Sequence, residues 1–513
     1  MGAQRTRNPA ASVEERRLAV VDLGSNTFRL VVFAYLPGRP PRMIDEIRDP
    51  VRLSAGMADG VILPEAIERA RHAAGAYARF CRTIGIEEVA VVATSAIREA
   101  KNQHEVLEAL GGPDGLQVRV ISTEQEATYG YLGAINATTL RDGGVLDVGG
   151  GSMQLSRVRE RQLTDFVSYR LGAVRATEGF LTDDPPKKRQ LKALRRHVET
   201  SLGEVEWAQS LGDRLLGIGG SIRTLAAMAQ RRTDYPLREI HGFRLSHPVL
   251  QELIDEMAVR DARERARLPG LKADRADIVL GAALVVSEVM EQTDIDAVEV
   301  CAGGLREGVY FERILGGDPA LLQDVREATV LSLAEGYRAD LDHAGHVAFI
   351  ADRIYSGLCR TGLQDDDPVE REWLWTASLL HDVGVLIDYH DHHKHSQYLV
   401  LNAGLPGFDH RELALIASLI RGHRKRLPGV GPYGTLMEKG DERRIDRLAV
   451  CLRLAEQLER GRSRAVTAVA ADSDGTTLRL KITCESDPSV AIWAASQEQP
   501  IVQRAFGLAL EID

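Results

Sequence analysis

The chain has 513 residues, 44% of them hydrophobic, and is too long for a single hydrophobic core. Because 74 Asp and Glu outweigh 64 Lys and Arg, the formal net charge is -10, and no overall positive field would attract a polyanion. An anionic ligand must therefore be held by local clusters. Five scattered cysteines without CxxC spacing argue against a disulfide framework and favour a reducing cytoplasm.

The N-terminal residues and the longest apolar runs indicate neither a secretory signal nor a membrane span. Residues 1–15 are polar and lack the apolar stretch of a secretory signal, so we predict a disordered tail there. The longest apolar runs, such as IVLGAALVV from Ile278 to Val286, reach about half the length of a bilayer span. We expect no membrane segment.

Residues 16–138 alternate short β-rich runs with helical stretches, which predicts an α/β domain. LAVVDLG and RLVVFAYL are separated by a tight polar turn and predict a hairpin. A helix is expected from Pro64 to Ile84. The runs EEVAVVAT and LQVRVIS predict two more strands, which lead into SAIREA and into the helix EQEATYGYLGAIN.

Residues 139–316 repeat this pattern from GGVLDVGGGSMQLSRV onward. Asp22 and Asp147 end similar apolar runs 125 residues apart, about the size of one α/β domain, so we interpret the two segments as a duplication. Two such lobes would bring their turns face to face across a cleft. The runs LLGIGGSIRTLA and VEVCAGGLREGVY add two glycine-rich turns to the second lobe.

The composition changes at LGGDPALL, from Leu315 to Leu322. Residues 317–464 show apolar spacing of i, i+3, i+4 and predict an all-α domain. Residues 465–513 alternate again in TTLRLKIT and VAIWAA and predict a small α/β domain.

The turns after Asp22 and Asp147 are candidate phosphate-binding sites. Glycines let backbone N–H groups converge on a phosphate, and a following Ser adds a hydroxyl donor. An aspartate before the glycines would repel phosphate, but it could hold a hard cation that neutralises the ligand. A simple tight turn capped by the aspartate is the alternative. Neither turn ends in Lys-Ser/Thr, so a Walker-type nucleotide site is disfavoured.

Three further residues stand where strands become helices. Arg98 follows a strand end and could clamp phosphate oxygens, although it could also be an ordinary solvated arginine. Glu124 and Glu126 do not share a helix face, so at most one points into a cleft, where it could act as a general base on water. From the residues alone, either glutamate could instead be a helix N-terminal carboxylate.

In this order, the motifs VVDLGSNTFRLVV, ATSAIREA, LDVGGGS, RLGAVR, GIGGSIRTLA and GGLREGV resemble the exopolyphosphatase/guanosine pentaphosphate phosphohydrolase family. That family is a branch of the actin-like (ribonuclease H-like) ATPase superfamily, and the helical region with LLHDVG resembles its long form. The resemblance implies two actin-like lobes with an interlobe cleft, followed by an HD-like all-α domain and the small α/β domain. It also implies a cytoplasmic homodimer.

The implied activity is hydrolysis of terminal phosphate from inorganic polyphosphate with Mg²⁺ or another divalent cation. By matched position, Glu126 would be the base, and Asp147 would anchor the cation. The phosphoryl group would be held by residues of the two turns and by one arginine: Gly24, Ser25, Asn26, Arg98, Gly149, Gly150, Gly151 and Ser152. Guanosine pentaphosphate is the alternative substrate.

One departure from the family is informative. Family members commonly continue GGGSTE, whereas this chain has Met153 and Gln154. A glutamine offers Mg²⁺ a carbonyl oxygen but no charge, which should weaken cation binding. Gln154, through its carbonyl oxygen, and Asp22 are additional candidate cation ligands. A regulatory polyphosphate-binding protein with weak or no hydrolysis is the third alternative.

The helical region contains a second set of candidates. His343, His381 and Asp382 resemble the HD hydrolase metal pattern, and Glu456 stands where its last aspartate would be. Hydrogen bonds between helices are the alternative role. The segments DYHDHHKHSQY and RGHRKR are rich in histidine and basic residues, and we interpret them as the wall of a polyanion channel: His393, Lys394, His395, His423, Arg424 and Lys425. Nucleic acid is a weaker candidate because aromatics make up only 5%.

Overall fold

The computed structural model describes residues 15–112, 115–425, 427 and 429–513, so the predicted tail, apart from Glu15, lies outside the described residues. The chain divides into two compact units. Unit 1 contains residues up to Arg231 together with Arg244–Gln323, and unit 2 contains Arg232–Phe243 and Asp324–Asp513. Within the described part of the chain, no helix has the length and apolar character needed to cross a bilayer.

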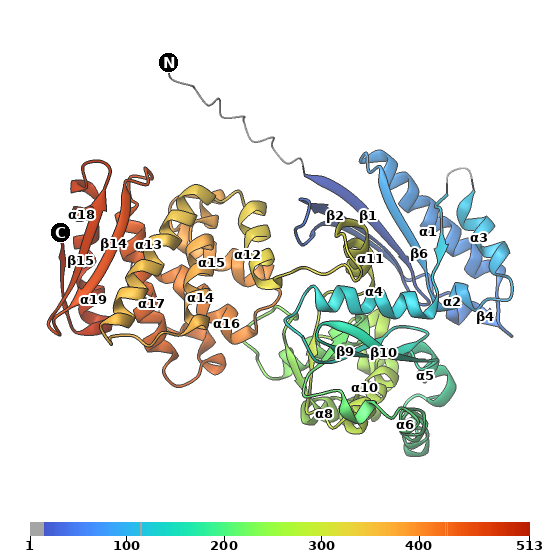
Figure 1. The fold of residues 1–513 in the computed structure, drawn as a ribbon. Coiled ribbons are helices and arrows are strands. Elements are labelled where there is room, and N and C mark those ends of the chain that lie inside the picture. Colours follow the sequence, from blue (N-terminus) through green and yellow to red (C-terminus); the bar gives the residue numbers. More distant parts are fainter. Residues whose placement is uncertain (1–14, 113–114, 426, 428) are drawn as a thin grey trace. The chain divides into compact units, whose positions relative to one another are not determined.

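Lobe I of unit 1 is built on a five-stranded sheet of order β3-β2-β1-β6-β7 (Figure 1). Its strands are β1 (Arg16–Leu23), β2 (Phe28–Tyr35), β3 (Arg42–Asp49), β6 (Glu88–Ala93) and β7 (Arg119–Val120), with a small hairpin of β4 (Met57–Ala58) and β5 (Val61–Ile62). Its helices are α1 (Pro64–Thr83), α2 (Ser95–Arg98), α3 (Gln103–Gly111) and α4 (Thr123–Ile135). The predicted hairpin and long helix are confirmed as β1-β2 and α1, whereas LQVRVIS forms only the two-residue strand β7.

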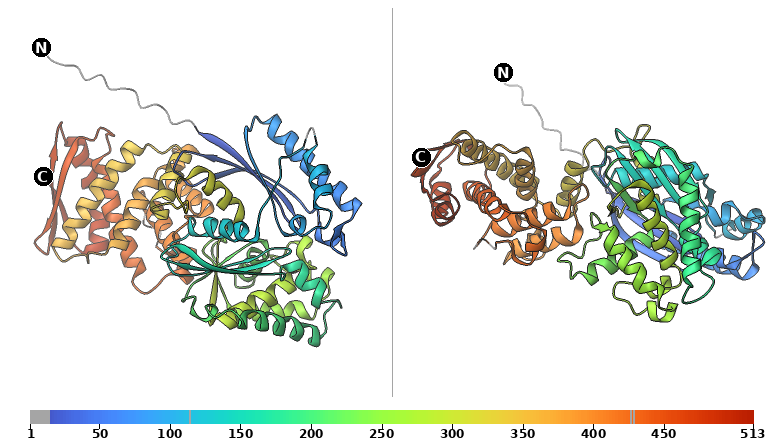
Figure 2. Two further views of the ribbon diagram at one scale, coloured as in Figure 1. Left: turned by 45° about the vertical axis from the view of Figure 1, so that its right-hand side comes forward. Right: turned by 90° about the horizontal axis from the view of Figure 1, so that it is seen from below.

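Lobe II is built on a six-stranded sheet of order β10-β9-β8-β11-β13-β12. Its strands are β8 (Gly143–Val148), β9 (Met153–Arg159), β10 (Gln162–Tyr169), β11 (Leu215–Ile218), β12 (Arg244–Ser246) and β13 (Ala297–Val300). Its helices are α5 (Ala173–Phe180), α6 (Lys188–Gly203), α7 (Gly220–Arg232), α8 (His247–Ala258), α9 (Ala262–Arg265), α10 (Val279–Thr293) and α11 (Leu305–Ile314). Helices α6 and α8 both pack against α10, and these helices lie below the sheet in Figure 1 and in the left view of Figure 2.

The two sheets have matching topology. In each, the first strand pairs antiparallel with the second, the second pairs antiparallel with the third, and two later strands join parallel on the other side. The order β3-β2-β1-β6-β7 thus corresponds to β10-β9-β8-β11-β13, and β12 is an extra edge strand. A duplicated architecture explains why similar strand-turn-strand motifs occur in both halves of the sequence.

The last helix of each lobe packs on the sheet of the other lobe. Helix α4 contacts β8 to β11 of lobe II, α11 contacts β1 of lobe I, and the two helices pack against each other between the sheets (Figure 1). Glycines permit this close approach, since a Cβ on Gly133 would lie 2.0 Å from the carbonyl oxygen of Gly304. The predicted division at residues 138 and 139 therefore separates the two sheets but not their helices.

Unit 2 consists of helices followed by a small sheet. The helices are α12 (Val325–Gly336), α13 (Leu341–Arg360), α14 (Pro368–Leu380), α15 (His392–Ala403), α16 (His410–Gly422) and α17 (Asp441–Leu458), with a 3₁₀ turn η4 (Val383–Leu386). The sheet has the order β14-β15-β16 and is formed by β14 (Val466–Ser473), β15 (Thr477–Cys484) and β16 (Ala509–Ile512), with α18 (Ser489–Ser496) and α19 (Gln499–Phe506) before its last strand. One apolar core joins the helices and this sheet.

The unit boundary differs from the predicted one in two respects. It lies after Gln323 rather than after residue 316, because the side chain of Asn136 accepts from the N–H of Leu322 and donates to the carbonyl of Ala320. The segment Arg232–Phe243, predicted within lobe II, belongs to unit 2. Its Leu237 lies in the core of that unit, where apolar burial holds the segment.

Candidate active site

One cavity in unit 1 is lined by both lobes. Asp22 lies near the end of β1 and Asp147 near the end of β8, so the duplicated topology brings the two strand ends together. Ten of the predicted site residues line this cavity: Asp22, Gly24, Ser25, Asn26, Glu126, Asp147, Gly149, Gly150, Gly151 and Ser152. Two are not among the described lining residues: Arg98 and Gln154.

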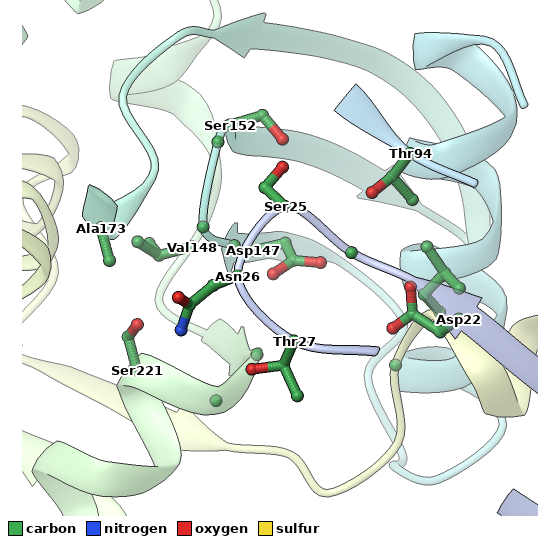
Figure 3. Close-up of a pocket in the computed structure, with 18 of the residues that line it drawn as sticks. Asp22, Ser25, Asn26, Thr27, Thr94, Asp147, Val148, Ser152, Ala173 and Ser221 are labelled. Atoms are coloured by element: carbon green, nitrogen blue, oxygen red, sulfur yellow. The ribbon is translucent and has the colours of Figure 1, made fainter. Parts of the chain in front are cut away.

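The two predicted turns lie against each other in this cavity. The hydroxyls of Ser25 and Ser95 are 2.9 Å apart, and a Cβ on Gly151 would lie 2.8 Å and 2.5 Å from them. Only glycine fits there without displacing the opposite lobe. In Figure 3 the turn containing Ser25 runs between Ser152 and Ser221, with Asp147 alongside. The turns therefore form one wall of glycines and hydroxyl-bearing side chains.

Three carboxylates meet at the cavity. Burial, together with the neighbouring carboxylate of Glu126, raises the pKa of Asp147 to about 7. Burial also raises the pKa of Asp22, against the lowering effect of Arg306, whose guanidinium Nη1 lies 3.2 Å from the Asp22 carboxylate. Because these groups disfavour each other's charge, a bound cation would relieve the repulsion. Hard oxygen ligands of this kind suit Mg²⁺.

Glu126 is held from two sides near the start of α4. Its Oε2 accepts a hydrogen bond of 2.7 Å from Arg98 Nη1, and its Oε1 accepts one of 3.4 Å from the hydroxyl of Ser152. Burial raises the pKa of Glu126, and the charge of Arg98 only partly offsets this effect. Glu124, two residues earlier, is exposed. The structure thus places Arg98 as the partner of Glu126 rather than on the cavity wall.

Five half-buried arginines line the cavity, and sequence reasoning assigned none of them a role: Arg29, Arg48, Arg223, Arg275 and Arg306. Burial, together with the charges of Arg306 and Arg29, lowers the pKa of Arg223 to about 10. Burial, together with the charge of Arg48, likewise lowers the pKa of Arg275 to about 10. Such crowding of like charges favours an anionic ligand. Three of the five, Arg29, Arg223 and Arg306, stand within the motifs quoted from the sequence, and that position could have indicated a role at the cavity.

Two residues lie next to Asp147 in space, Gly219 and Gln154. Gly219, before α7, has a φ of 92°, and a Cβ on it would lie 2.7 Å from Asp147 Oδ1. The position therefore requires glycine. Gln154 is paired with Asp147 across β8 and β9, so the two side chains share a face of the sheet. Gln154 is only 3% exposed, and its buried Nε2 has no hydrogen-bond partner in the described chain.

The second predicted site lies in unit 2. Nε2 of His343 and Nε2 of His381 lie 3.1 Å and 3.2 Å from Glu456 Oε2, and Asp382 Oδ1 lies 3.5 Å from His381 Nε2. All four predicted residues are thus together.

The predicted polyanion channel is wrong for two of its members. His393 and His423 are 3% and 1% exposed, because the packing of α15 and α16 buries them. Lys394 and Lys425 are exposed but both bind the carboxylate of Asp391. The guanidinium of Arg424 stacks on the ring of Tyr389. For Lys394, His395, Arg424 and Lys425, the channel role stays a prediction.

Comparison with known proteins agrees with this geometry. Residues 31–316, more than half of the chain, match the Ppx/GppA phosphatase family, and residues 325–489 match domain III of Ppx/GppA phosphatases. The chain belongs to the Ppx/GppA phosphatase family. The resemblance seen in the sequence motifs is thereby confirmed.

Individual relatives show how far the similarity extends. A guanosine-5'-triphosphate,3'-diphosphate pyrophosphatase of Vibrio parahaemolyticus is 27% identical over 85% of this chain and 86% of its own length. The crystal structure of a Ppx/GppA family member from Aquifex aeolicus, 29% identical, covers 58% of this chain and 97% of its own with a TM-score of 0.51. A Cytophaga hutchinsonii exopolyphosphatase structure, 23% identical with a TM-score of 0.54, shares the fold over 58% and 98% of the two chains.

Proposed function

We propose that this phosphatase removes the terminal phosphate of inorganic polyphosphate in the interlobe cavity. The observation that carries the proposal is the meeting of three carboxylates, two opposed glycine turns and five arginines around one space. Arginines and backbone N–H groups suit the oxygens of a phosphate chain. The carboxylates supply what those donors lack, a base and a cation ligand.

In this proposal Glu126 is the base that orients the attacking water and accepts its proton. Its carboxylate is buried beside Ser152 of the second turn, and Arg98 fixes one of its oxygens. Phosphoryl transfer depends mainly on positioning and on stabilising charge, so no protein nucleophile is required. The turns around Ser25 and Gly150 would hold the terminal phosphoryl group from both lobes.

Mg²⁺ is part of the proposal. Asp147 and Asp22 would hold it, because their raised pKa values show carboxylates whose charge needs compensation. When bound, the cation would neutralise negative charge on the phosphoryl oxygens.

Guanosine pentaphosphate is the second candidate substrate. It is favoured by the relatives named as pyrophosphatases of guanosine-5'-triphosphate,3'-diphosphate. Inorganic polyphosphate is favoured by the cavity lining, in which none of the described residues is aromatic and able to stack on a guanine base. The polar lining suits a chain of phosphates.

The test is release of inorganic phosphate from long-chain polyphosphate and from guanosine pentaphosphate, assayed side by side with Mg²⁺ varied. A higher kcat/KM for polyphosphate is expected. A higher value for guanosine pentaphosphate would support the second candidate. Binding of polyphosphate without release from either substrate would identify a binding protein, the third alternative, and would overturn both enzymatic proposals.

A further inference from the structure

Six side chains converge in the helical unit, in a group we call the histidine centre: His343, His381, Asp382, His392, His423 and Glu456. They come from five places in the chain: α13, the end of α14, the start of α15, the residue after α16, and α17. The four histidines are at most 4% exposed. Packing of helices that lie far apart in sequence therefore concentrates imidazoles at one point.

The histidine centre contains two overlapping groups with the spacing of metal ligands. One group is His343, His381 and Asp382, and the other is Asp382, His392 and His423; in each, the ligand atoms all lie within 4.8 Å of one another. Asp382 belongs to both, with Oδ1 3.1 Å from His392 Nε2 and 3.8 Å from His423 Nε2. Glu456 Oε2 adds a carboxylate oxygen between His343 and His381.

Three of the four imidazoles are fixed in one orientation by backbone carbonyls. Nδ1 lies 2.7 Å from the carbonyl of Ser378 in His381, 2.8 Å from that of Tyr389 in His392, and 2.7 Å from that of Ile420 in His423. Since a carbonyl only accepts, each Nδ1 carries the proton, and the neutral ring then presents an unprotonated Nε2 to the centre. Outer hydrogen bonds of this kind orient the histidine ligands of metals.

The contact between His392 and His423 is the strongest evidence for a bound cation. Their Nε2 atoms are 2.9 Å apart, and each ring already donates through Nδ1. Two neutral imidazoles in this state would direct lone pairs at each other in a buried place. A cation between them, or an added proton on one ring, resolves this contact. Asp382 Oδ1 beside both nitrogens supplies the negative charge that a cation would need.

We propose that the histidine centre binds two divalent transition-metal ions that share Asp382. The first ion would take His343, His381, Asp382 and Glu456, and the second would take Asp382, His392 and His423. Four nitrogen and two carboxylate ligands select ions such as Mn²⁺, Fe²⁺, Co²⁺ or Zn²⁺ over Mg²⁺. The side chains of Asp382 and Glu456 are 14% and 13% exposed, so the two carboxylates are the solvent-accessible part of the centre through which ions could enter.

This inference goes beyond the phosphatase activity and concerns a different unit of the chain. The cavity of unit 1 has no histidine among its described lining residues, so the two sites offer different ligand chemistry. Arg462 donates to Asp382 Oδ2 at 2.5 Å, on the oxygen that does not face His392 and His423. That contact leaves Oδ1 available to the ions.

The experiment measures Co²⁺ bound to the full chain carrying Asp147→Asn, which removes one of the two proposed cation ligands of unit 1 and so weakens binding there. Metal-stripped protein is titrated with Co²⁺ by calorimetry, and retained metal is counted by elemental analysis after desalting. We expect two equivalents, with visible absorption bands of nitrogen-coordinated Co²⁺. His423→Gln should leave one equivalent, and Asp382→Asn should weaken binding of both by at least about tenfold.

The matched control is His346→Gln, because His346 is a partly buried histidine of α13 whose two nitrogens contact Glu459 and the carbonyl of Val466. It should still bind two equivalents. A stoichiometry of one or zero in the protein with an intact histidine centre would overturn the proposal; zero would indicate a shared proton between His392 and His423. Because this measurement uses the unaltered centre, it does not depend on the folding of the ligand variants.

Discussion

The cavity of unit 1 and the histidine centre of unit 2 are both lined by clustered ionisable groups, but they differ in chemistry. The cavity combines three carboxylates with arginines, hydroxyls and glycine turns, whereas the histidine centre combines four imidazoles with two carboxylates. Oxygen ligands suit a hard, weakly held cation such as Mg²⁺, and imidazoles suit borderline transition metals. The two places are therefore suited to different kinds of cation.

The two sites also differ in how the fold positions them. The cavity is built at strand ends and glycine turns, a setting in which backbone amides can bind an anion. The histidine centre is built at helix ends and on helix faces, where backbone carbonyls instead fix the imidazole rings. The first arrangement suits recognition of phosphate, and the second suits retention of metal.

The largest effect should come from Glu126→Gln. Glutamine keeps the size of the side chain but cannot accept a proton, so kcat for phosphate release should fall by about 10²- to 10⁴-fold. Binding of polyphosphate, measured by calorimetry, should stay intact. Retained turnover would show that another group is the base.

Glu124→Gln is the matched control, because Glu124 lies two residues away on the same helix with an exposed side chain. Its kcat should equal that of the parent protein.

Glu126→Gln should also leave Co²⁺ retention in the histidine centre unchanged. A loss of Co²⁺ would mean that the two sites are not independent.

The second prediction concerns Asp147→Asn and pH. Burial raises the pKa of Asp147 from 3.8 to about 7, so between these values the folded state holds a proton that the unfolded state has released. Stability of the metal-free protein should therefore fall with rising pH in this window, by at most about 1.4 kcal/mol per pH unit from this group. Asn removes the titration and should flatten that dependence, as measured by denaturant unfolding from pH 4 to pH 7.

The same variant sharpens the contrast between the sites. Mg²⁺ should stabilise the parent protein more at pH 8 than at pH 6, because binding must displace the proton of Asp147. In Asp147→Asn this Mg²⁺ effect should be small at both pH values. An unchanged Mg²⁺ effect in the variant would place the cation elsewhere.

Much of the cavity could be predicted because strand periodicity and glycine turns are local signals. The apolar runs before Asp22 and Asp147 and the glycines after them define two strand ends, and duplication brings these ends together. Position within the family motif favours Glu126 over Glu124 as the base, and the side chain of Glu126 is buried, in agreement with that prediction. The packing of α4 on the sheet of lobe II and of α11 on the sheet of lobe I has no local sequence signal, because it depends on tertiary contacts.

Long-range contacts explain what the sequence did not reveal. Arg48 reaches the cavity from the edge strand β3, and Arg275 reaches it from a short 3₁₀ turn (Ala273–Arg275); neither stands in a glycine motif. The neighbours of His423 in RGHRKR predict a basic surface segment, but the end of α16 places His423 in the interior beside His392. Composition describes a segment, whereas burial is decided residue by residue.

A smaller effect is expected from Arg98→Gln. Arg98 lowers the pKa of Glu126, so its removal should raise that pKa further above the ordinary value. The base must be ionised, and the acidic limb of the kcat profile should therefore move to higher pH. A shift of one pH unit would reduce the rate on that limb about tenfold.

Arg175→Gln is the control for Arg98→Gln, since Arg175 is a half-buried arginine that pairs with Glu99 rather than Glu126. Its pH profile should not move. If Arg98→Gln instead raises KM with the profile unchanged, then Arg98 binds substrate directly, as the sequence suggested.

The smallest effect is expected from Gln154→Glu, which tests how strictly the cavity depends on oxygen charge. Gln154 lies beside Asp147 on the same face of the sheet, and a carboxylate there would add negative charge near the proposed cation. The Mg²⁺ concentration for half-maximal rate should fall by roughly three- to tenfold, with the larger effect at higher pH. Gln154→Leu should raise that concentration only if the amide oxygen of Gln154 is a ligand. An unchanged Mg²⁺ requirement in both variants would place residue 154 outside the cation site, and Asp22 and Asp147 would then account for the whole carboxylate contribution to it.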